Sequence, residues 1–115
     1  MTNYKRGDIV LVLFPDSNLQ IAKKRPALIV QADNLQTNLP QVIVAMITSN
    51  ITRANHKSRV AVLLNSPEGK QSDSVIVTDN LATVQEKFID KVLGNLLTMN
   101  VVESALAHTF NLKLG

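Results

Sequence analysis

With 115 residues, three phenylalanines, one tyrosine and no cysteine, the chain is expected to form one domain, residues 1–115, without a disulfide, a thiolate metal site or a cysteine nucleophile. Its longest apolar run, residues 42–47, is far shorter than the roughly 20 residues of a membrane span, so we expect a cytoplasmic protein. The formal net charge of +3 is uneven, because residues 1–59 carry eight Lys or Arg against three Asp while residues 60–115 carry four Lys against six acids.

The N-terminal half reads as three strands separated by polar segments. A β-branched, apolar run predicts a strand over residues 9–14, which Pro, Asp and Asn residues would end. Residues 15–24 are then expected to form a loop. Pro26 cannot donate a hydrogen bond to a sheet, so we expect it to open the next strand, residues 27–31. A polar stretch leads to a third predicted strand, residues 42–48.

The next part of the chain alternates between polar and apolar segments. Residues 50–58 are polar and basic and predict a loop. Residues 59–64 read as a strand that a turn-forming segment ends, and residues 75–77 predict another. Residues 88–96 fit either a helix or a strand with a bend at Gly94, and we favour the strand.

The C-terminal segment has apolar residues at helical spacing. Thr98 is the expected N-cap, and the amphipathic helix that follows is expected to end at Gly115. Five or six short strands with one terminal helix predict a mainly β fold, a compact barrel partly covered by that helix.

Arg25 and the pair Thr48 and Ser49 stand at the ends of two predicted neighbouring strands. A guanidinium offers a planar fork of donors that suits phosphate, and hydroxyl groups can donate to the same oxygens. A basic segment precedes one strand and another follows the other. This arrangement favours binding of a phosphodiester, although a strand end that satisfies its own backbone would use the same residue types.

Basic and polar residues near these strand ends are candidates for contact with a nucleic acid. Clustered Lys and Arg attract phosphate, although a solvated surface explains any single cluster equally well. The few aromatic residues argue against a surface that binds ranks of stacked bases. The expected RNA contacts are Lys23, Lys24, Ser49, Asn50, Arg53 and Lys57.

Four ordered segments resemble the MazF/PemK family of toxin endoribonucleases. They are RGDIV at residues 6–10, KKRPALIV at 23–30, AMITS at 45–49 and SVIV at 74–77. The resemblance implies an SH3-like β-barrel with a C-terminal helix that forms a homodimer. It also implies sequence-selective cleavage of single-stranded RNA without a metal or other cofactor, through attack of the 2′-hydroxyl, and neutralisation by a cognate antitoxin peptide.

The resemblance also implies roles for individual residues. Arg25 would bind and neutralise the scissile phosphate, and Thr48 would orient it. Asp79 matches a position at which some members use an acidic residue as the general base. A carboxylate needs a raised pKa to be an effective base near neutral pH.

The chain departs from the family pattern at two positions. Val77 replaces an arginine that many members have two residues before the acid, and Ala82 replaces a basic or polar residue. Loss of one charge donor costs roughly 10² to 10³ in rate in comparable sites. The chain is therefore expected to be a slow nuclease, or one that uses another cation. If it is instead a barrel with little turnover, Val77→Arg would raise its cleavage.

Other readings stay open at this point. One is a non-enzymatic inhibitor like those of the CcdB family, which shares the fold. Another is a barrel that binds RNA or antitoxin with little turnover. His56 could protonate a leaving group but suits a solvated loop as well, and His108 is expected at the surface of the helix. No spacing of His or acidic residues indicates a metal site.

Overall fold

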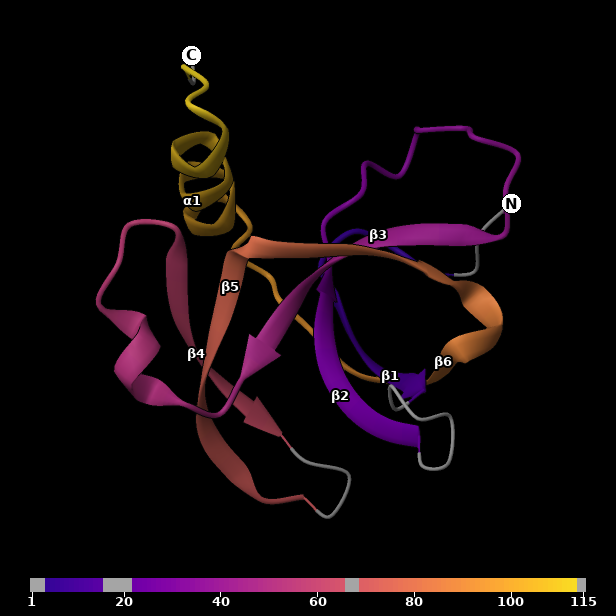
Figure 1. Ribbon diagram of the computed structural model, residues 1–115, viewed down its shortest axis with the longest axis horizontal. Coiled ribbons are helices and arrows are strands. Elements are labelled where there is room, and N and C mark those ends of the chain that lie inside the picture. The colour runs from indigo at the N-terminus through magenta and orange to yellow at the C-terminus, as the bar shows by residue number, and fades with distance from the viewer. Residues whose placement is uncertain (1–3, 16–21, 66–68, 114–115) are drawn as a thin grey trace.

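The computed structural model describes residues 4–15, 22–65 and 69–113. In this part of the chain, six antiparallel strands form one sheet that curls into a half-barrel, and one α-helix stands at the β4 and β5 side of it (Figure 1). The strand order is β4-β5-β3-β2-β1-β6. The strands are β1 (Asp8–Pro15), β2 (Ala22–Ile29), β3 (Gln41–Thr48), β4 (Arg59–Asn65), β5 (Gln71–Gln85) and β6 (Ile89–Asn95). The mainly β fold with a terminal helix is confirmed.

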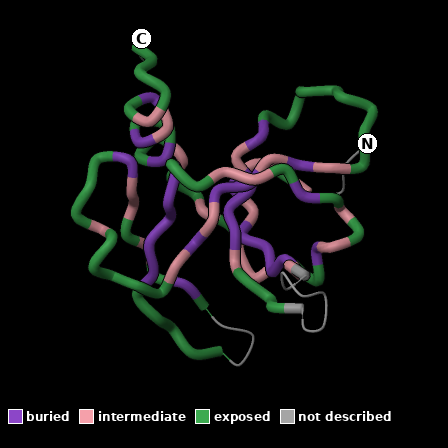
Figure 2. Tube along the Cα trace, viewed as in Figure 1, coloured by how far each residue is buried: buried purple, intermediate pink, exposed green. Residues whose placement is uncertain are grey.

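The curled sheet carries two hydrophobic clusters, so neighbouring residues of one strand enter different cores. Figure 2 shows which stretches of the strands are buried. In β2, Ala27 and Ile29 belong to one hydrophobic cluster and Leu28 belongs to the other. Side chains of a strand alternate between faces, which explains the division. Each fully buried Val, Leu or Ile stabilises the fold by roughly 1.5–3 kcal/mol. The two cores therefore fix the register of the sheet, because a shift of one strand by one residue would move its side chains from one core into the other.

Strand β2 begins earlier than the sequence predicts. Pro26 lies inside it, opposite Leu11 of β1, and the pairing with β1 extends back to Ala22. The pairing with β3 begins only at Ala27, which lies opposite Met46. A proline has no N–H to give to a second neighbour, so the ladder to β3 ends where Pro26 stands. The first half of β2 is therefore bonded on one side alone.

Strand β5 is much longer than the three residues predicted for it. It pairs with β3 as far as Met46↔Val77 and resumes at Ala45↔Leu81, so residues 78–80 form a bulge. Bulges sharpen the twist of a strand, which allows β5 to follow the curl of the sheet. As a consequence, Asp79 lies within β5 and not after its end.

The segments that end the chain differ from expectation only at their boundaries. The strand favoured for residues 88–96 is confirmed as β6, after a 3-10 turn, η2 (Glu86–Phe88). Helix α1 (Asn100–Phe110) follows Met99 as N-cap instead of Thr98. Its C-cap is Asn111, whose left-handed φ of 56° turns the chain so that the N–H of Leu112 reaches the carbonyl of Ala107 at 2.7 Å.

Helix α1 is fastened to the sheet by apolar packing and by a polar contact. Val102 is fully buried in the cluster that also holds Leu28 and Ile76. The hydroxyl groups of Thr78 and Thr109 lie 2.8 Å apart.

Among the residues that the structure describes, no helix has the length and apolar composition that a membrane-spanning helix needs.

Candidate functional site

A cleft of about 490 Å³ opens where β2 and β3 are no longer paired. Its lining includes five residues that the sequence predicts to be catalytic or to bind RNA, and they come from the ends of β2 and β3. Two further strands, β4 and β5, close its other side. The lining residues are Lys23, Lys24, Arg25, Pro26, Ile47, Thr48, Ser49, Leu64, Ser72 and Ser74.

Arg25 and Thr48 lie across from each other on the same face of the sheet. Ala27 pairs with Met46, and each of the two cleft residues stands two positions further along its own strand, toward the end where the strands separate. Because the side-chain period of a strand is two residues, both point to the face that Ala27 and Met46 share. A guanidinium and a hydroxyl thus converge on one space, as the sequence predicts.

The hydroxyl of Thr48 is oriented by its own loop. Its Oγ1 accepts a hydrogen bond from the backbone N–H of Asn50 at 3.2 Å. A hydroxyl that accepts one bond still has its hydrogen to donate. Thr48 is half-buried and Ser49 is exposed, so the hydroxyl can serve as a positioned donor to an anion in the cleft.

The two lysines of the cleft are differently placed. Lys24 Nζ lies 3.1 Å from Asp90 Oδ2 of β6, and the two side chains are 54% and 40% exposed. Exposed ion pairs contribute about 0–1 kcal/mol, so a phosphate can compete with Asp90 for this lysine. Lys23 is exposed and forms no ion pair with another described residue.

Asp79 is not among the residues that line the cleft. Its carboxylate is held by Arg59, with Nε to Oδ1 at 3.2 Å and Nη2 to Oδ2 at 2.9 Å. These hydrogen bonds lower the pKa of Asp79, and Ser58 adds to the effect. A lowered pKa weakens a carboxylate as a base. The general base expected at Asp79 is therefore not brought to the phosphate site.

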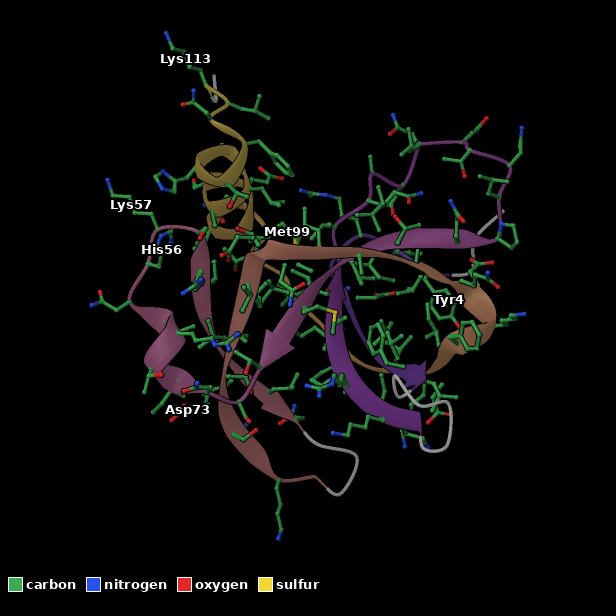
Figure 3. All side chains as sticks on the ribbon, viewed as in Figure 1. Tyr4, His56, Lys57, Asp73, Met99 and Lys113 are labelled. Atoms are coloured by element: carbon green, nitrogen blue, oxygen red, sulfur yellow. The ribbon has the colours of Figure 1, made fainter. Side chains whose placement is uncertain are left out.

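The basic loop after β3 does not form one patch with the cleft. Asn50 caps the 3-10 turn η1 (Ile51–Ala54), because its Oδ1 accepts from Thr52 N at 3.2 Å and from Thr52 Oγ1 at 2.6 Å. Lys57 and His56 lie beside α1 (Figure 3). Arg53 is exposed on η1, and it does not line the cleft.

His56 and His108 belong to a structural contact between the loop and the helix. Their ring centroids are 6.1 Å apart, edge to face. His56 Nδ1 accepts from the backbone N–H of Ser58 at 3.1 Å and lies 2.6 Å from its Oγ. Within the described residues, no group of three or more His, Asp or Glu is placed to hold a metal ion.

Sequence reasoning missed the side of the cleft that β4 and β5 form. Leu64 pairs with Ser72, and Ser74 is 4% exposed at the base of the cleft. Ser72 and Ser74 are spaced by two residues just before the apolar run 75–77. The residue between them is Asp73, so the segment is polar on both faces and shows no strand alternation in the sequence.

Val77, for which the resemblance to the family led us to expect an arginine, is 4% exposed. It pairs with Met46 of β3 and with Arg59 of β4. Directly opposite residues of an antiparallel pair have Cβ atoms about 4.5–5.5 Å apart. Arg59 is therefore the cation beside Val77, and its guanidinium engages Asp79.

Comparison with known proteins places these features in a family. Residues 5–110 match the family described as PemK-like, MazF-like toxin of type II toxin-antitoxin system. The endoribonuclease MazF of Staphylococcus epidermidis is 30% identical over 100 residues, which cover 86% of this chain and 82% of that protein.

Solved structures share the fold. The Mycobacterium tuberculosis toxin MazF-mt6 superposes with a TM-score of 0.73 at 22% identity, covering 93% of this chain and 99% of the other. A mycobacterial endoribonuclease in complex with its cognate antitoxin gives 0.73 at 20% identity, covering 97% and 99%. Because the family match spans nearly the whole chain and agrees with the curled sheet and its cleft, this protein belongs to the PemK-like, MazF-like toxins of type II toxin-antitoxin systems.

Proposed function

We propose that this protein is an endoribonuclease toxin that cleaves single-stranded RNA in the cleft between β2 and β3. The observation that carries the proposal is the position of Arg25 across from Thr48. The family match and the endoribonuclease from Staphylococcus epidermidis support an enzyme over a CcdB-like inhibitor.

The reaction needs no protein nucleophile. The ribose 2′-oxygen attacks the adjacent phosphorus while the bond from phosphorus to the 5′-oxygen breaks, which leaves a 2′,3′-cyclic phosphate and a 5′-hydroxyl. Negative charge develops on the phosphorane oxygens in the transition state. Arg25 stabilises that charge, and Thr48 donates to one of the same oxygens. Lys23, Lys24 and Ser49 hold the strand through its phosphates.

The transfer of protons requires groups beyond the cleft wall. The described residues that line the cleft include neither a carboxylate nor an imidazole. Arg25 stays charged at any working pH, so it is a poor proton acceptor. We therefore assign Arg25 and Thr48 to binding and charge stabilisation, and not to removal of the 2′-hydroxyl proton.

The proposal extends to partners and location. We infer that a cognate antitoxin neutralises this protein, since the mycobacterial endoribonuclease was solved with one. We also infer a homodimer that acts in the cytoplasm, where cellular RNA is found. Loss of RNA cleavage on addition of the antitoxin, and the mass of the protein in solution, test these two points.

The main test uses purified protein, a long single-stranded RNA and EDTA. We expect cleavage at a limited set of sites that leaves 5′-hydroxyl ends. Arg25→Ala, purified in the same way, controls for contaminating nuclease and should lose at least a factor of roughly 10² in rate. Equal cleavage by both proteins, or none by the wild type at any concentration, would reject the proposal.

A further inference from the structure

A second pocket, of about 320 Å³, lies beside the cleft, between η1 and the β4–β5 hairpin. Its volume is at the lower end of the roughly 300–1,000 Å³ typical of small-ligand sites. Ser74 lines both the pocket and the cleft, so the two adjoin at this residue of β5. We call it the base pocket. Its lining includes Ile51, Ala54, Ala61, Leu63, Asp73 and Val75.

Val75, Ala61 and Asp73 of the base pocket lie on the same face of the sheet as Arg25 and Thr48. Thr48 pairs with Val75 of β5, and Val75 pairs with Ala61 of β4. Paired residues share a face, so Arg25, Thr48, Val75 and Ala61 form one row across four strands. Neighbouring strands lie about 4.8 Å apart. A ligand that reaches along this row passes from the phosphate site into the pocket.

Asp73 is the charged residue of the base pocket. It stands two positions before Val75 on β5, which makes it a diagonal same-face neighbour of Thr48, and such neighbours lie about 7–8 Å apart. This is the reach of one nucleotide. Among the described residues, no ion pair neutralises the Asp73 carboxylate.

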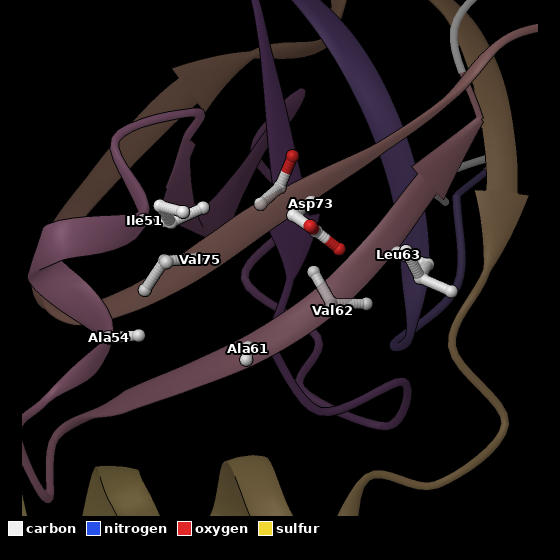
Figure 4. A pocket seen from close by; sticks show the side chains of 8 residues that line it. Ile51, Ala54, Ala61, Val62, Leu63, Asp73 and Val75 are labelled. Atoms are coloured by element: carbon white, nitrogen blue, oxygen red, sulfur yellow. The ribbon is translucent and has the colours of Figure 1, made fainter.

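The walls around Asp73 are apolar. Ile51 is 56% exposed and Leu63 is 62% exposed, and Figure 4 shows the Asp73 side chain between Ile51 and Val75 on one side and Val62 and Leu63 on the other. Nucleobases taken out of a stack bind between apolar side chains and present their hydrogen-bonding edge to polar groups. The base pocket offers both features.

We propose that the base pocket binds the nucleobase next to the scissile phosphate, and that Asp73 selects a base with an exocyclic amino group. This inference rests on the proposed function. A carboxylate accepts from the amino groups of cytosine, adenine or guanine. The pairing edge of uracil has one N–H between two carbonyl oxygens, and those oxygens repel a carboxylate. Uracil is therefore disfavoured at this nucleotide.

The test begins with the cut sites that the wild-type protein makes in a long RNA. A short RNA with the most efficient site is then made with each of the four bases at the two positions that flank the cut. At one position we expect kcat/KM for uracil to be lower than for the preferred amino-bearing base by roughly 5- to 150-fold.

Asp73→Asn is the decisive variant, because an amide can donate to the carbonyl oxygens of uracil. We expect the preference at that position to fall to within about threefold, with the preference at the other position unchanged. Asp33→Asn is the matched control. It removes the same charge from the loop after β2, where Asp33 accepts from the backbone N–H of Arg6, and it should keep the wild-type preference.

Ala61→Leu gives an independent test, because it fills an exposed position in the wall of the pocket. It should raise KM for the normal RNA severalfold but not for an RNA that is abasic at the selected position.

Circular dichroism confirms that each variant is folded. If the wild type cleaves RNA but accepts uracil equally at both positions, or if Asp73→Asn keeps the preference, the base pocket is refuted while the nuclease stands. If the wild type cleaves nothing, the proposed function itself fails.

Discussion

The guanidinium of Arg59 holds both carboxylate oxygens of Asp79 across the β4–β5 hairpin, at 3.2 and 2.9 Å. The pair lies at the bulge of β5, beyond the pairing of Val77 with Met46. Asp79 does not line the cleft that holds Arg25 and Thr48. Its carboxylate instead contributes to the contact between two strands.

The first prediction concerns the pH dependence of stability. The folded pKa of Asp79 lies below its ordinary value of 3.8, because Arg59 donates to the charged form. The contribution is therefore fully present above about pH 4 and is lost as the pH falls through the lower, folded pKa. We expect Asp79→Asn to lower the urea midpoint at pH 7, and the difference from wild type to shrink below pH 4. A difference that grew on acidification would contradict the sign of this pKa shift.

The second prediction compares Asp79 with Arg25 in catalysis. Arg25→Ala should lower kcat by roughly 10² to 10³, as when a single donor to a transition-state oxyanion is removed. Arg25→Lys should recover only part of the loss, because an ammonium lacks the planar fork. Asp79→Asn should cost much less than Arg25→Ala. Single-turnover cleavage of one short RNA measures all three, and Lys91→Ala, an exposed residue of β6, is the control for a lost charge. A larger loss for Asp79→Asn would restore its role as the base.

The third prediction corrects the expectation that Val77→Arg raises activity. Val77 is 4% exposed and faces Arg59 across the hairpin. A new cation there would be buried, crowded and close to a like charge. We expect a loss of roughly 2–4 kcal/mol in the free energy of unfolding and no gain in cleavage.

Val92→Arg is the matched control for this substitution, because Val92 is 48% exposed. Its cost should stay within about 0.5 kcal/mol. Urea unfolding of the two variants measures the contrast. If Val77→Arg were as stable as the control and cleaved RNA faster than wild type, the sequence-based expectation would be right after all.

The sequence predicted the parts of the fold that depend on local patterns. Apolar runs and helical spacing identify most strands and α1, because these periodicities follow from the geometry of a single element. The start of β2 was missed because Pro26 was expected to exclude pairing on both sides. In the structure it prevents pairing only with β3. The choice between one neighbour and two depends on the whole sheet.

The part of the candidate site that depends on adjacent strand ends could also be predicted. Arg25 and Thr48 could be paired because they end adjacent strands, and their opposition follows from register. The separation of Asp79 from them could not be foreseen, because the bulge at residues 78–80 is invisible in a single sequence. The position of Asp73 could not be foreseen either. In the sequence it is one polar residue among others, and its place beside Thr48 becomes apparent only when the register across β3, β5 and β4 is known.

The last prediction isolates the hydroxyl of Thr48. Thr48→Val keeps the shape but removes the donor to the phosphate, and a hydrogen bond to a charged group is worth roughly 1.5–3 kcal/mol. We therefore expect kcat to fall by roughly 10- to 150-fold. Thr48→Ser keeps the hydroxyl and should stay within about threefold of wild type. Because Thr48→Val also loses the bond from Asn50, its urea midpoint must be measured beside its rate. Thr83→Val, an exposed residue in the distal part of β5, should change neither. Equal rates for Thr48→Val and Thr48→Ser would show that the phosphate does not use this hydroxyl, and Arg25 alone would then carry the site.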